Sequence, residues 1–455
     1  MINTLFQSFR EDKPFLKTFV LLALPIGLQS MVMNVTHTIA SLMVGQLGDL
    51  EVSATSLAGQ IFFILNLIIV GIVSGATIFL AQYFGKGDHK QLKVSIALGF
   101  ILIIAVSILF SVVSLAFPAS ILQIFSTEKE LIELASNYLK IVCISYIPTG
   151  ITLAVSMVFR NIGQAKLPLK ITIMGIFINV GLSTSLIFGN FGFPELGIYG
   201  AAVSIVITKF IEMILFVWFL YRKFSDYAPL LTDLLGINRS FLKTFFKTSL
   251  PVIINEAFWS IGIALYSIVF YKMGYTIGAA VGIAKVLEQL LISFFIGAGH
   301  AGAIILGQAI GEGKRDEAPE LAKKMGLYTG VGGIGISFML LIGTPLYLTL
   351  YQGISTDVKD AIITIMIYLA FILPLKGMNF IHIMGTLRAG GDTFMCMIID
   401  NFSLWCVSIP LTFLFGYFLD FGIEIVYLFV VIDDICKFLL IQWRIRGRKW
   451  IHNLI

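Results

Sequence analysis

The chain has 455 residues, of which 58% are hydrophobic and only 13% are charged, and its mean hydropathy is +0.95. A soluble protein of this length needs more charged side chains to cover its surface, so the composition excludes a soluble globular protein. The net charge of +5 does not indicate a nucleic-acid partner, because the Lys and Arg residues fall in short connections between long apolar stretches.

Twelve apolar stretches predict twelve transmembrane helices, each long enough to cross a hydrocarbon core of ~30 Å, and the chain must then contact the lipid bilayer. In chain order they cover residues 16–42, 52–83, 94–117, 131–158, 168–189, 199–221, 248–271, 277–309, 325–350, 360–386, 394–418 and 423–443. The predicted fold class is therefore an all-α polytopic membrane protein. Basic residues are concentrated in alternate connections, and the other connections hold only Lys129, Lys272 and Lys359. The positive-inside rule then predicts that both termini are cytoplasmic.

An internal repeat runs through the chain at an offset of 226 residues. Residues 74–87, SGATIFLAQYFGKG, align with residues 300–313, HAGAIILGQAIGEG. The same offset relates two pairs of prolines, which we predict to act as hinges or gates because proline bends a helix: Pro25 with Pro251, and Pro148 with Pro374. The repeat predicts two pseudo-symmetric lobes of six helices, an architecture known in transporters.

The repeat also sets the predicted domain boundaries. We expect an N-terminal lobe at residues 1–225, an amphipathic and basic linker helix at residues 226–247 on the cytoplasmic surface, and a C-terminal lobe at residues 248–455.

Glu256 lies well inside the seventh stretch, with no basic residue within two turns on its own helix. A charge at the centre of a span costs ~2.5–3.5 kcal/mol on insertion scales, so it normally faces a cavity or a partner. A buried carboxylate without a local partner either takes up a proton or ligates a cation such as Na⁺. We therefore predict that Glu256 couples transport to an ion, with a hydrogen-bonded structural carboxylate as the alternative.

Two further sets of polar residues mark a candidate cavity in the C-terminal half. Lys285 and Glu288 share one helix face, and either neutralise each other or line the cavity. Lys376 and Asn379 share a face just after Pro374, where we expect the proline to break the helix.

Asp400, in the eleventh stretch, is the second predicted coupling residue. Lys376 is expected to be the counter-charge of Asp400 or of Glu256. Asp433, Asp434 and Lys437 lie close together in the twelfth stretch, and we expect one of the two acids to form a structural pair with Lys437.

The membrane interior of the N-terminal half is nearly uncharged, apart from Lys209 and Glu212, which we expect to form a structural pair. Its candidate cavity residues are polar but neutral: Asn34, His37, Gln60 and Asn179. Met33 and Phe62 also lie where a cavity is expected, and would offer flat organic cations an adaptable apolar surface. This distribution predicts that ion coupling resides in the C-terminal half.

Motifs of enzymes and cofactor sites are missing from the sequence. It contains no HExxH, no phosphate-binding loop and no nucleophile triad, and its four cysteines lie in apolar stretches without CxxC spacing. We expect no enzymatic activity, no metal cluster and no cofactor other than a coupling ion.

Several stretches, taken together and in this order, resemble the multidrug and toxic compound extrusion (MATE) family, and most closely its bacterial branches. They are LALPIGLQS (22–30), SLMVGQLGD (41–49), SGATIFLAQYFGKGD (74–88), FRNIGQAKLPL (159–169), NVGLSTSLIFG (179–189), FGFPELGIYGAAVSIVIT (191–208) and GTLRAGGDTFMCMIID (385–400). The resemblance covers essentially the whole chain.

The resemblance implies a V-shaped molecule that exports organic molecules by alternating access, driven by a gradient of Na⁺ or H⁺. It implies amphipathic organic cations as substrates, and the bacterial cytoplasmic membrane as the location, where a monomer suffices. Glu256 matches the acidic residue of the seventh span in members that couple ions through the C-terminal lobe, and Asn179 matches a polar residue of the N-terminal site.

Two positions depart from the family pattern. Many bacterial relatives have Asp where this chain has Ala40, and an acid where it has Ser183. These departures suggest that the N-terminal ion site is lost and that coupling rests on Glu256, with Asp400 and Lys376 tuning it.

The sequence also bears on two rival functions. A flippase for lipid-linked precursors of related architecture would need an arginine-rich cavity for pyrophosphate, and the spans hold few arginines. A membrane scaffold or receptor would not need acids in its core and would usually carry a soluble signalling domain.

Overall fold

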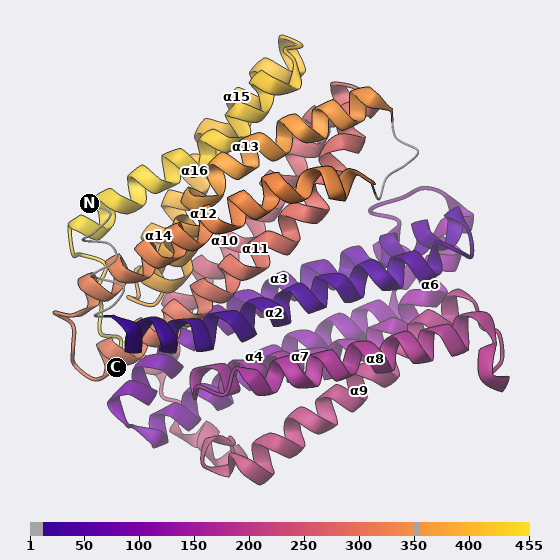
Figure 1. Ribbon diagram of the computed structural model, residues 1–455. Coiled ribbons are helices and arrows are strands. Elements are labelled where there is room, and N and C mark those ends of the chain that lie inside the picture. Colours follow the sequence, from indigo (N-terminus) through magenta and orange to yellow (C-terminus); the bar gives the residue numbers. More distant parts are fainter. Residues whose placement is uncertain (1–11, 350–354) are drawn as a thin grey trace. The chain divides into compact units, whose positions relative to one another are not determined.

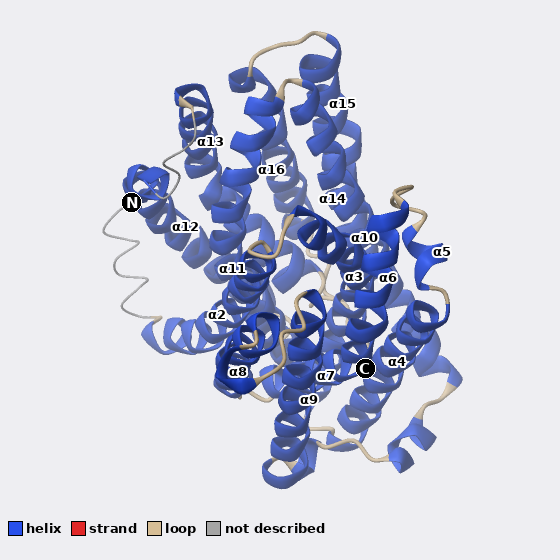
Figure 2. Ribbon diagram, turned by 90° about the vertical axis from the view of Figure 1, so that its right-hand side faces the viewer, coloured by secondary structure: helices blue, strands red, loops and turns tan. Residues whose placement is uncertain are grey.

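The computed structural model of the protein describes residues 12–349 and 355–455, apart from the side chains at positions 37, 38 and 275. Figure 2 shows helices and connecting loops throughout the described part, where the single β-bridge joins Gly391 and Ile451. The all-α fold class predicted from the apolar stretches is therefore confirmed.

Contacts divide the chain into two units. One unit is Gln29–Ser249, and the other is Leu250–Ile455 together with the chain up to Leu28. Helices α2 (Lys13–Val44) and α10 (Arg239–Lys272) therefore each contribute to both units. This grouping differs from a simple division at the linker, because the start of α2 packs with the second half of the chain.

The Gln29–Ser249 unit is built around α3, which packs against α4, α6 and α7 (Figure 1). Its elements, besides the parts of α2 and α10, are α3 (Asp49–Lys86), α4 (His89–Ala116), α5 (Pro118–Leu122), α6 (Lys129–Val142), the 3₁₀ turn η1 (Cys143–Ser145), α7 (Tyr146–Asn161), α8 (Lys166–Phe188), η2 (Asn190–Gly192), α9 (Ile198–Lys223), η3 (Ser225–Tyr227) and η4 (Leu231–Gly236).

The Leu250–Ile455 unit is built around α13, which packs against α11, α12 and α16. Its elements, besides the parts of α2 and α10, are α11 (Tyr275–Gly311), α12 (Ala318–Thr349), α13 (Thr356–Phe380), η5 (Ile381–Leu387), α14 (Thr393–Asn401), η6 (Phe402–Ser408), α15 (Ile409–Thr412), η7 (Phe413–Phe418) and α16 (Ile423–Arg446). Of these, η5, η6 and η7 are π-helical turns. Because π-turns are frequent at functional sites, they draw attention to α13 and α14.

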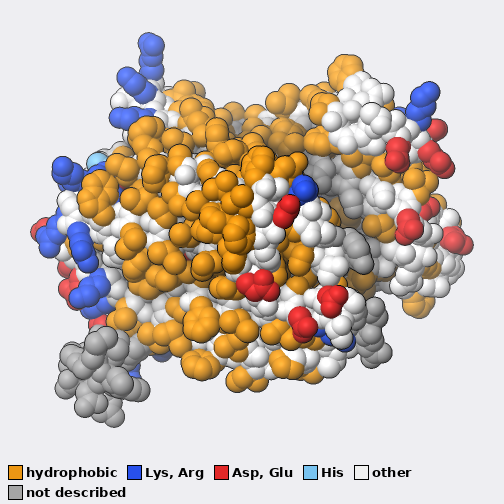
Figure 3. All heavy atoms as spheres, turned by 90° about the horizontal axis from the view of Figure 1, so that it is seen from above, with side chains coloured by type: hydrophobic (Ala, Val, Ile, Leu, Met, Phe, Trp, Pro, Cys, Tyr) orange, Lys and Arg blue, Asp and Glu red, His pale blue; other side chains and the backbone are white. Residues whose placement is uncertain are grey.

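Eleven helical segments among the described residues are long and apolar enough to cross a membrane. The twelfth predicted span is α16, whose 24 residues also have sufficient length. It is less apolar because Asp433, Asp434 and Lys437 lie in its middle, and all three are buried. Many large hydrophobic side chains elsewhere are exposed, and they dominate the face in Figure 3. An apolar exterior around buried charges is what a hydrocarbon environment requires.

The predicted linker helix at residues 226–247 is wrong as a single element. The segment forms two short 3₁₀ turns, η3 and η4, with Pro229 between them, and a regular helix begins only at Arg239. The side chain of Asn238 accepts a hydrogen bond from the backbone N–H of Phe241 at 2.7 Å, which caps the start of α10. The rings of Phe241 and Phe245 each lie 5.5 Å from that of Phe79, so they pack on α3 and do not form a membrane-surface face.

The predicted break at Pro374 is also wrong. Pro374 lies inside α13, as Pro25 lies inside α2 and Pro251 inside α10, and each helix continues past its proline. Pro148 lies in the first turn of α7, directly after the 3₁₀ turn η1, where a missing backbone N–H costs little.

Candidate functional site

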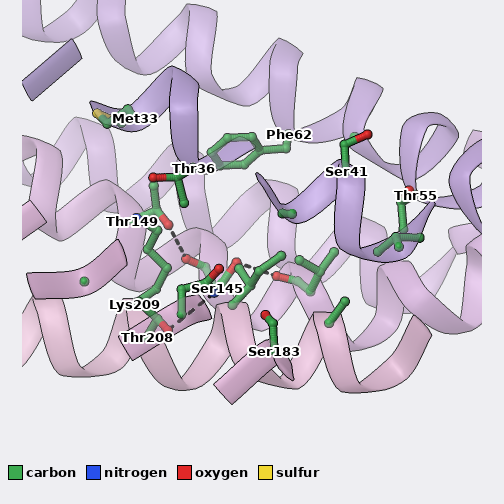
Figure 4. A pocket seen from close by; sticks show the side chains of 18 of the residues that line it. Met33, Thr36, Ser41, Thr55, Phe62, Ser145, Thr149, Ser183, Thr208 and Lys209 are labelled. Carbon is green, nitrogen blue, oxygen red and sulfur yellow. Dashed lines mark hydrogen bonds between the residues drawn. The ribbon is translucent and has the colours of Figure 1, made fainter. Parts of the chain in front are cut away.

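A pocket of about 300 Å³ lies within the Gln29–Ser249 unit, between α2, α3, η1 and helices α6 to α9 (Figure 4). Small and polar side chains give it hydroxyl and amide groups, and larger apolar residues complete its wall. The residues that line it include Met33, Thr36, Ala40, Ser41, Phe62, Tyr138, Ser145, Tyr146, Thr149, Thr172, Asn179, Ser183, Ile205, Thr208, Lys209 and Glu212.

Lys209 and Glu212, both on α9, form the ion pair predicted from their spacing. The ammonium nitrogen of Lys209 lies 2.8 Å from Oε2 of Glu212. The carboxylate rests against α8 at Gly175, where a β-carbon would collide with it. The expectation of a purely structural pair missed that both residues line the pocket, because the spacing reveals the pairing but not the cavity.

The pocket contains some of the residues predicted for an N-terminal cavity and not others. Asn179, Met33 and Phe62 line it, and so do Ala40 and Ser183, the two positions that depart from the family pattern. Asn34 and Gln60 are absent from its lining, and Gln60 is exposed. The side chain of His37 lies outside the described part of the structure.

Glu256 in α10 has a basic partner, contrary to what its own helix predicts. Nη2 of Arg388 lies 2.9 Å from Oε1 of Glu256, and the Arg388 side chain is only 4% exposed. Arg388 follows the π-turn η5, so the partner comes from a distant part of the sequence. Sequence reasoning assigned this arginine to a cytoplasmic connection and missed its role.

The repeat carried a signal that points to this pair. Arg160 is the counterpart of Arg388 when two residues are added to the offset, because FRNIGQ (159–164) then aligns with LRAGGD (387–392). Nη2 of Arg160 donates to Oε1 of Gln29 at 2.7 Å. Gln29 and Glu256 stand four and five residues after the repeated prolines Pro25 and Pro251. Each half of the repeat thus has an arginine bound to the polar group about one turn past its proline.

A first group of three charges connects three helices of the Leu250–Ile455 unit. Nζ of Lys376 lies 2.6 Å from Oε1 of Glu288 and 3.6 Å from Oδ2 of Asp434. Asn379 donates to the backbone oxygen of Asp434 at 2.8 Å and to Oδ1 of the same residue at 3.1 Å. The prediction that Lys376 serves Asp400 or Glu256 is therefore wrong. Of the two alternatives for Lys285 and Glu288, mutual neutralisation is excluded, because Lys285 is exposed and has no ion pair among the described residues.

A second group centres on Lys437 in α16. Its Nζ lies 2.7 Å from Oδ1 of Asp400 and 2.7 Å from Oδ2 of Asp433, which confirms the predicted pairing within the twelfth span. Asn255 completes the site by donating to Oδ2 of Asp400 at 2.8 Å. The remaining oxygen of Asp433, Oδ1, is buried and has no hydrogen-bond partner among the described residues.

These pairs leave the interior of the unit with an excess of negative charge. The described ion pairs contain the carboxylates of Glu256, Glu288, Asp400, Asp433 and Asp434, and the cations of Lys376, Arg388 and Lys437. Each lysine bridges two carboxylates, so five acids share three cations. Because an uncompensated charge is costly in a low-dielectric interior, such a network favours uptake of a proton or a cation. Within the described residues, no three His, Cys, Asp or Glu side chains form a group arranged to hold a metal ion.

Comparisons with known proteins agree with this architecture. The family model described as MatE matches residues 25–184 and 251–414, more than half of the chain, and the two segments begin 226 residues apart, as the repeat does. The chain is 27% identical to an uncharacterized transporter, YisQ, of Bacillus subtilis, over 100% of this chain and 99% of the relative. It is 26% identical to a probable multidrug resistance protein, YoeA, also of Bacillus subtilis, over 90% of this chain and 89% of the relative.

The fold also matches solved structures of transporters. A crystal structure of MATE in complex with MaL6 superimposes with a TM-score of 0.86 at 18% identity, over 95% of this chain and 97% of that one. An outward-facing multidrug resistance MATE family transporter gives the same TM-score at 18% identity, over 95% and 96% of the two chains. With the family model matched in both repeats and the fold shared along the chain, this protein belongs to the MatE family of multidrug efflux transporters.

Proposed function

We propose that this protein is a secondary active antiporter that exports small amphipathic organic molecules in exchange for H⁺ or Na⁺. We assign it to the bacterial cytoplasmic membrane with both termini cytoplasmic, because its basic residues follow the positive-inside pattern. A monomer is sufficient for this mechanism. The names of its relatives as multidrug resistance proteins support the class of substrate.

The observation that carries the proposal is the surplus of carboxylates in the Leu250–Ile455 unit. A permanently closed ion-pair network would need equal numbers of acids and bases. Here Lys376 and Lys437 each serve two acids, so each group has one negative charge in excess. A monovalent cation that binds there relieves an electrostatic cost, which is how an ion gradient can bias a conformational equilibrium.

Glu256 and Asp400 remain the proposed coupling residues, with roles that now include their partners. A proton or Na⁺ at Glu256 competes with Arg388, so ion binding would loosen the contact between α10 and the chain after η5. An ion bound at Asp400 would weaken the attraction between its carboxylate and the ammonium of Lys437. We add Asp433 as a candidate, because its Oδ1 is buried without a partner among the described residues.

The transport cycle needs only that binding of the ion lowers the affinity for the exported molecule, and the reverse. Facing outward, the network takes up an ion and the exported molecule leaves. Facing inward, the ion leaves and a new molecule binds. A coupling free energy of ~1–3 kcal/mol is sufficient for such an exchange.

The decisive experiment is dye efflux from proteoliposomes with Na⁺ and pH gradients imposed separately. We expect Glu256→Gln to abolish gradient-driven efflux, and one of the two gradients to drive the unmodified protein. Glu424→Gln is the matched control, because Glu424 is an exposed acid in the first turn of α16. Normal gradient-driven efflux by Glu256→Gln would overturn the assignment of this residue, and failure of both gradients to drive efflux would overturn the antiport proposal.

The flippase alternative has little support in the pocket. A pyrophosphate group needs several cations around it. Among the described residues that line the pocket, Lys209 is the single cation, and its charge is already matched by Glu212.

A further inference from the structure

We propose that the pocket of the Gln29–Ser249 unit binds small uncharged amphiphiles that carry an acceptor oxygen, and that it discriminates against organic cations. The inference deepens the proposed efflux function, because it names the class of molecule that this pocket would take. It departs from the expectation that the substrates are cationic. Three properties of the described pocket residues carry it: the sign of the charge that a ligand meets first, the hydrogen-bonding groups that are still free, and the apolar wall.

The charge that faces the pocket is positive. The Lys209 side chain is 26% exposed, whereas that of Glu212 is 7% exposed and its carboxylate is held against α8 at Gly175. A ligand therefore meets the ammonium before it meets the carboxylate. An organic cation would be repelled at short range by Lys209 and could reach Glu212 only by displacing it, whereas an anion would bring an unmatched charge to a neutral ion pair.

The free donors of the pocket require an acceptor. Lys209 has three N–H donors, of which the bond to Glu212 uses one. Tyr146 also lines the pocket, and its hydroxyl is buried without a hydrogen-bond partner among the described residues. Because Tyr146 is 0% exposed, a ligand reaches the two remaining donors of Lys209, and a carbonyl or sulfonyl oxygen would satisfy them.

Two other hydroxyls of the pocket, those of Thr36 and Thr149, are acceptors only, because their protons are already used. Thr36 donates to the backbone oxygen of Val32 at 2.8 Å, and Thr149 to that of Ser145 at 2.7 Å. The lone pairs that remain suit an N–H or O–H group of the ligand. A molecule with an amide, sulfonamide or similar neutral polar group therefore matches both kinds of site.

An apolar body completes the description of the ligand. Met33, Phe62 and Ile205 line the pocket, and the rings of Phe62 and Tyr146 lie 5.8 Å apart. A volume of about 300 Å³ is at the lower end of small-molecule sites, so the ligand has one or two rings and no long chain.

Three probes with one fluorescent body test the proposal: dansyl amide (neutral), dansyl glycine (carboxylate) and dansyl choline (quaternary ammonium). Binding is measured by fluorescence with the full chain in nanodiscs without a gradient, and empty nanodiscs correct for partitioning into lipid. We expect the neutral probe to bind about tenfold more tightly than the cation, a difference of about 1.4 kcal/mol. Equal or tighter binding of the cation, or tighter binding of the carboxylate than of the amide, would overturn the proposal.

A charge variant connects the selectivity to Lys209. Lys209→Met leaves the carboxylate of Glu212 without its cation, so we expect the preference to reverse toward dansyl choline. Lys140→Met is the matched control, because Lys140 is an exposed lysine of the same unit. An unchanged preference in Lys209→Met, with a normal melting temperature, contradicts the inference. If Lys209→Met does not fold, the wild-type probe series decides.

The outcome is separable from that of the proposed function. Binding of the three probes needs no gradient, whereas the antiport proposal is tested only by gradient-driven efflux. Neutral-probe selectivity without driven efflux would overturn the antiport proposal alone, and driven efflux without that selectivity would overturn the present inference alone.

Discussion

Arg388, which is buried, and Glu256, which is partly buried, form an ion pair that joins the chain after η5 to α10, with 2.9 Å between Nη2 and Oε1. Its counterpart in the other unit is the hydrogen bond from Arg160 to Gln29, at 2.7 Å. The repeat thus preserves the arginine and its position, but only the second unit presents it with a carboxylate. The contact between Arg160 and Gln29 has a neutral acceptor. The contact between Arg388 and Glu256 is an ion pair, which a proton or a cation bound by Glu256 can break.

Loss of Arg388 alone should therefore lower the stability of the fold more than loss of both Arg388 and the charge of Glu256. Arg388→Met leaves the partly buried Glu256 without its cation, and removing one partner of a buried pair typically costs about 3–5 kcal/mol. In the double variant Glu256→Gln with Arg388→Met, no charge is left unpaired, and we expect much of the stability to return. Thermal unfolding in one detergent checks this. Equal melting temperatures for the single and double variants would show that the pair does not stabilise the fold.

Asp433 should matter for coupling more than for folding. Asp433→Asn removes one of the two surplus charges and keeps the contact between Lys437 and Asp400. We expect gradient-driven efflux to fall roughly tenfold, within the range of ordinary coupling energies, with little change in melting temperature. Glu424→Gln should retain normal efflux. Full efflux in Asp433→Asn would remove this residue from the coupling network.

Gly175 should control the position of the Glu212 carboxylate. A β-carbon at Gly175 would collide with Oε1 of Glu212, whereas one at Gly181, also on α8, would meet nothing within 4 Å. We expect Gly175→Ala to push the carboxylate into the pocket, to lower stability by about 1–3 kcal/mol, and to raise the affinity for dansyl choline. Gly181→Ala is the control and should change neither. Identical probe binding in both variants would show that the carboxylate can move at no cost.

Gly297 should be required for close packing of α11 on α2. A β-carbon there would lie 2.4 Å from the backbone oxygen of Ala23 and 2.4 Å from the backbone nitrogen of Gly27, and backbone atoms cannot move aside as side chains do. Small residues permit such close contacts between membrane helices. We expect Gly297→Ala to lower the melting temperature, corresponding to about 1–3 kcal/mol. In contrast, Gly282→Ala on the same helix meets nothing within 4 Å and should be neutral. A stable Gly297→Ala variant would contradict this account of the contact.

The sequence by itself determined the features that depend on local order along the chain. Apolar length indicated the helices, the 226-residue offset indicated the repeat, and residues three or four apart on one helix gave the pairs Lys209–Glu212 and Asp433–Lys437. Such pairs follow from the pitch of the helix, since these neighbours share one face whatever the helix packs against. For Lys437 the pitch allowed either Asp433 or Asp434, and the structure shows that the partner on its own helix is Asp433.

Only the tertiary structure decided which distant groups meet. It paired Glu256 with Arg388 and Glu288 with Lys376, where the sequence offered Lys376 as a counter-charge for Glu256 and left Glu288 either paired with Lys285 or lining a cavity. It also turned Lys209, Glu212 and Tyr146 into the wall of one pocket. The physical reason is that contacts between helices depend on how each is rotated about its axis. In a membrane, where most faces are apolar, that rotation is set by packing and by buried charges, and the hydrophobic pattern alone does not fix it.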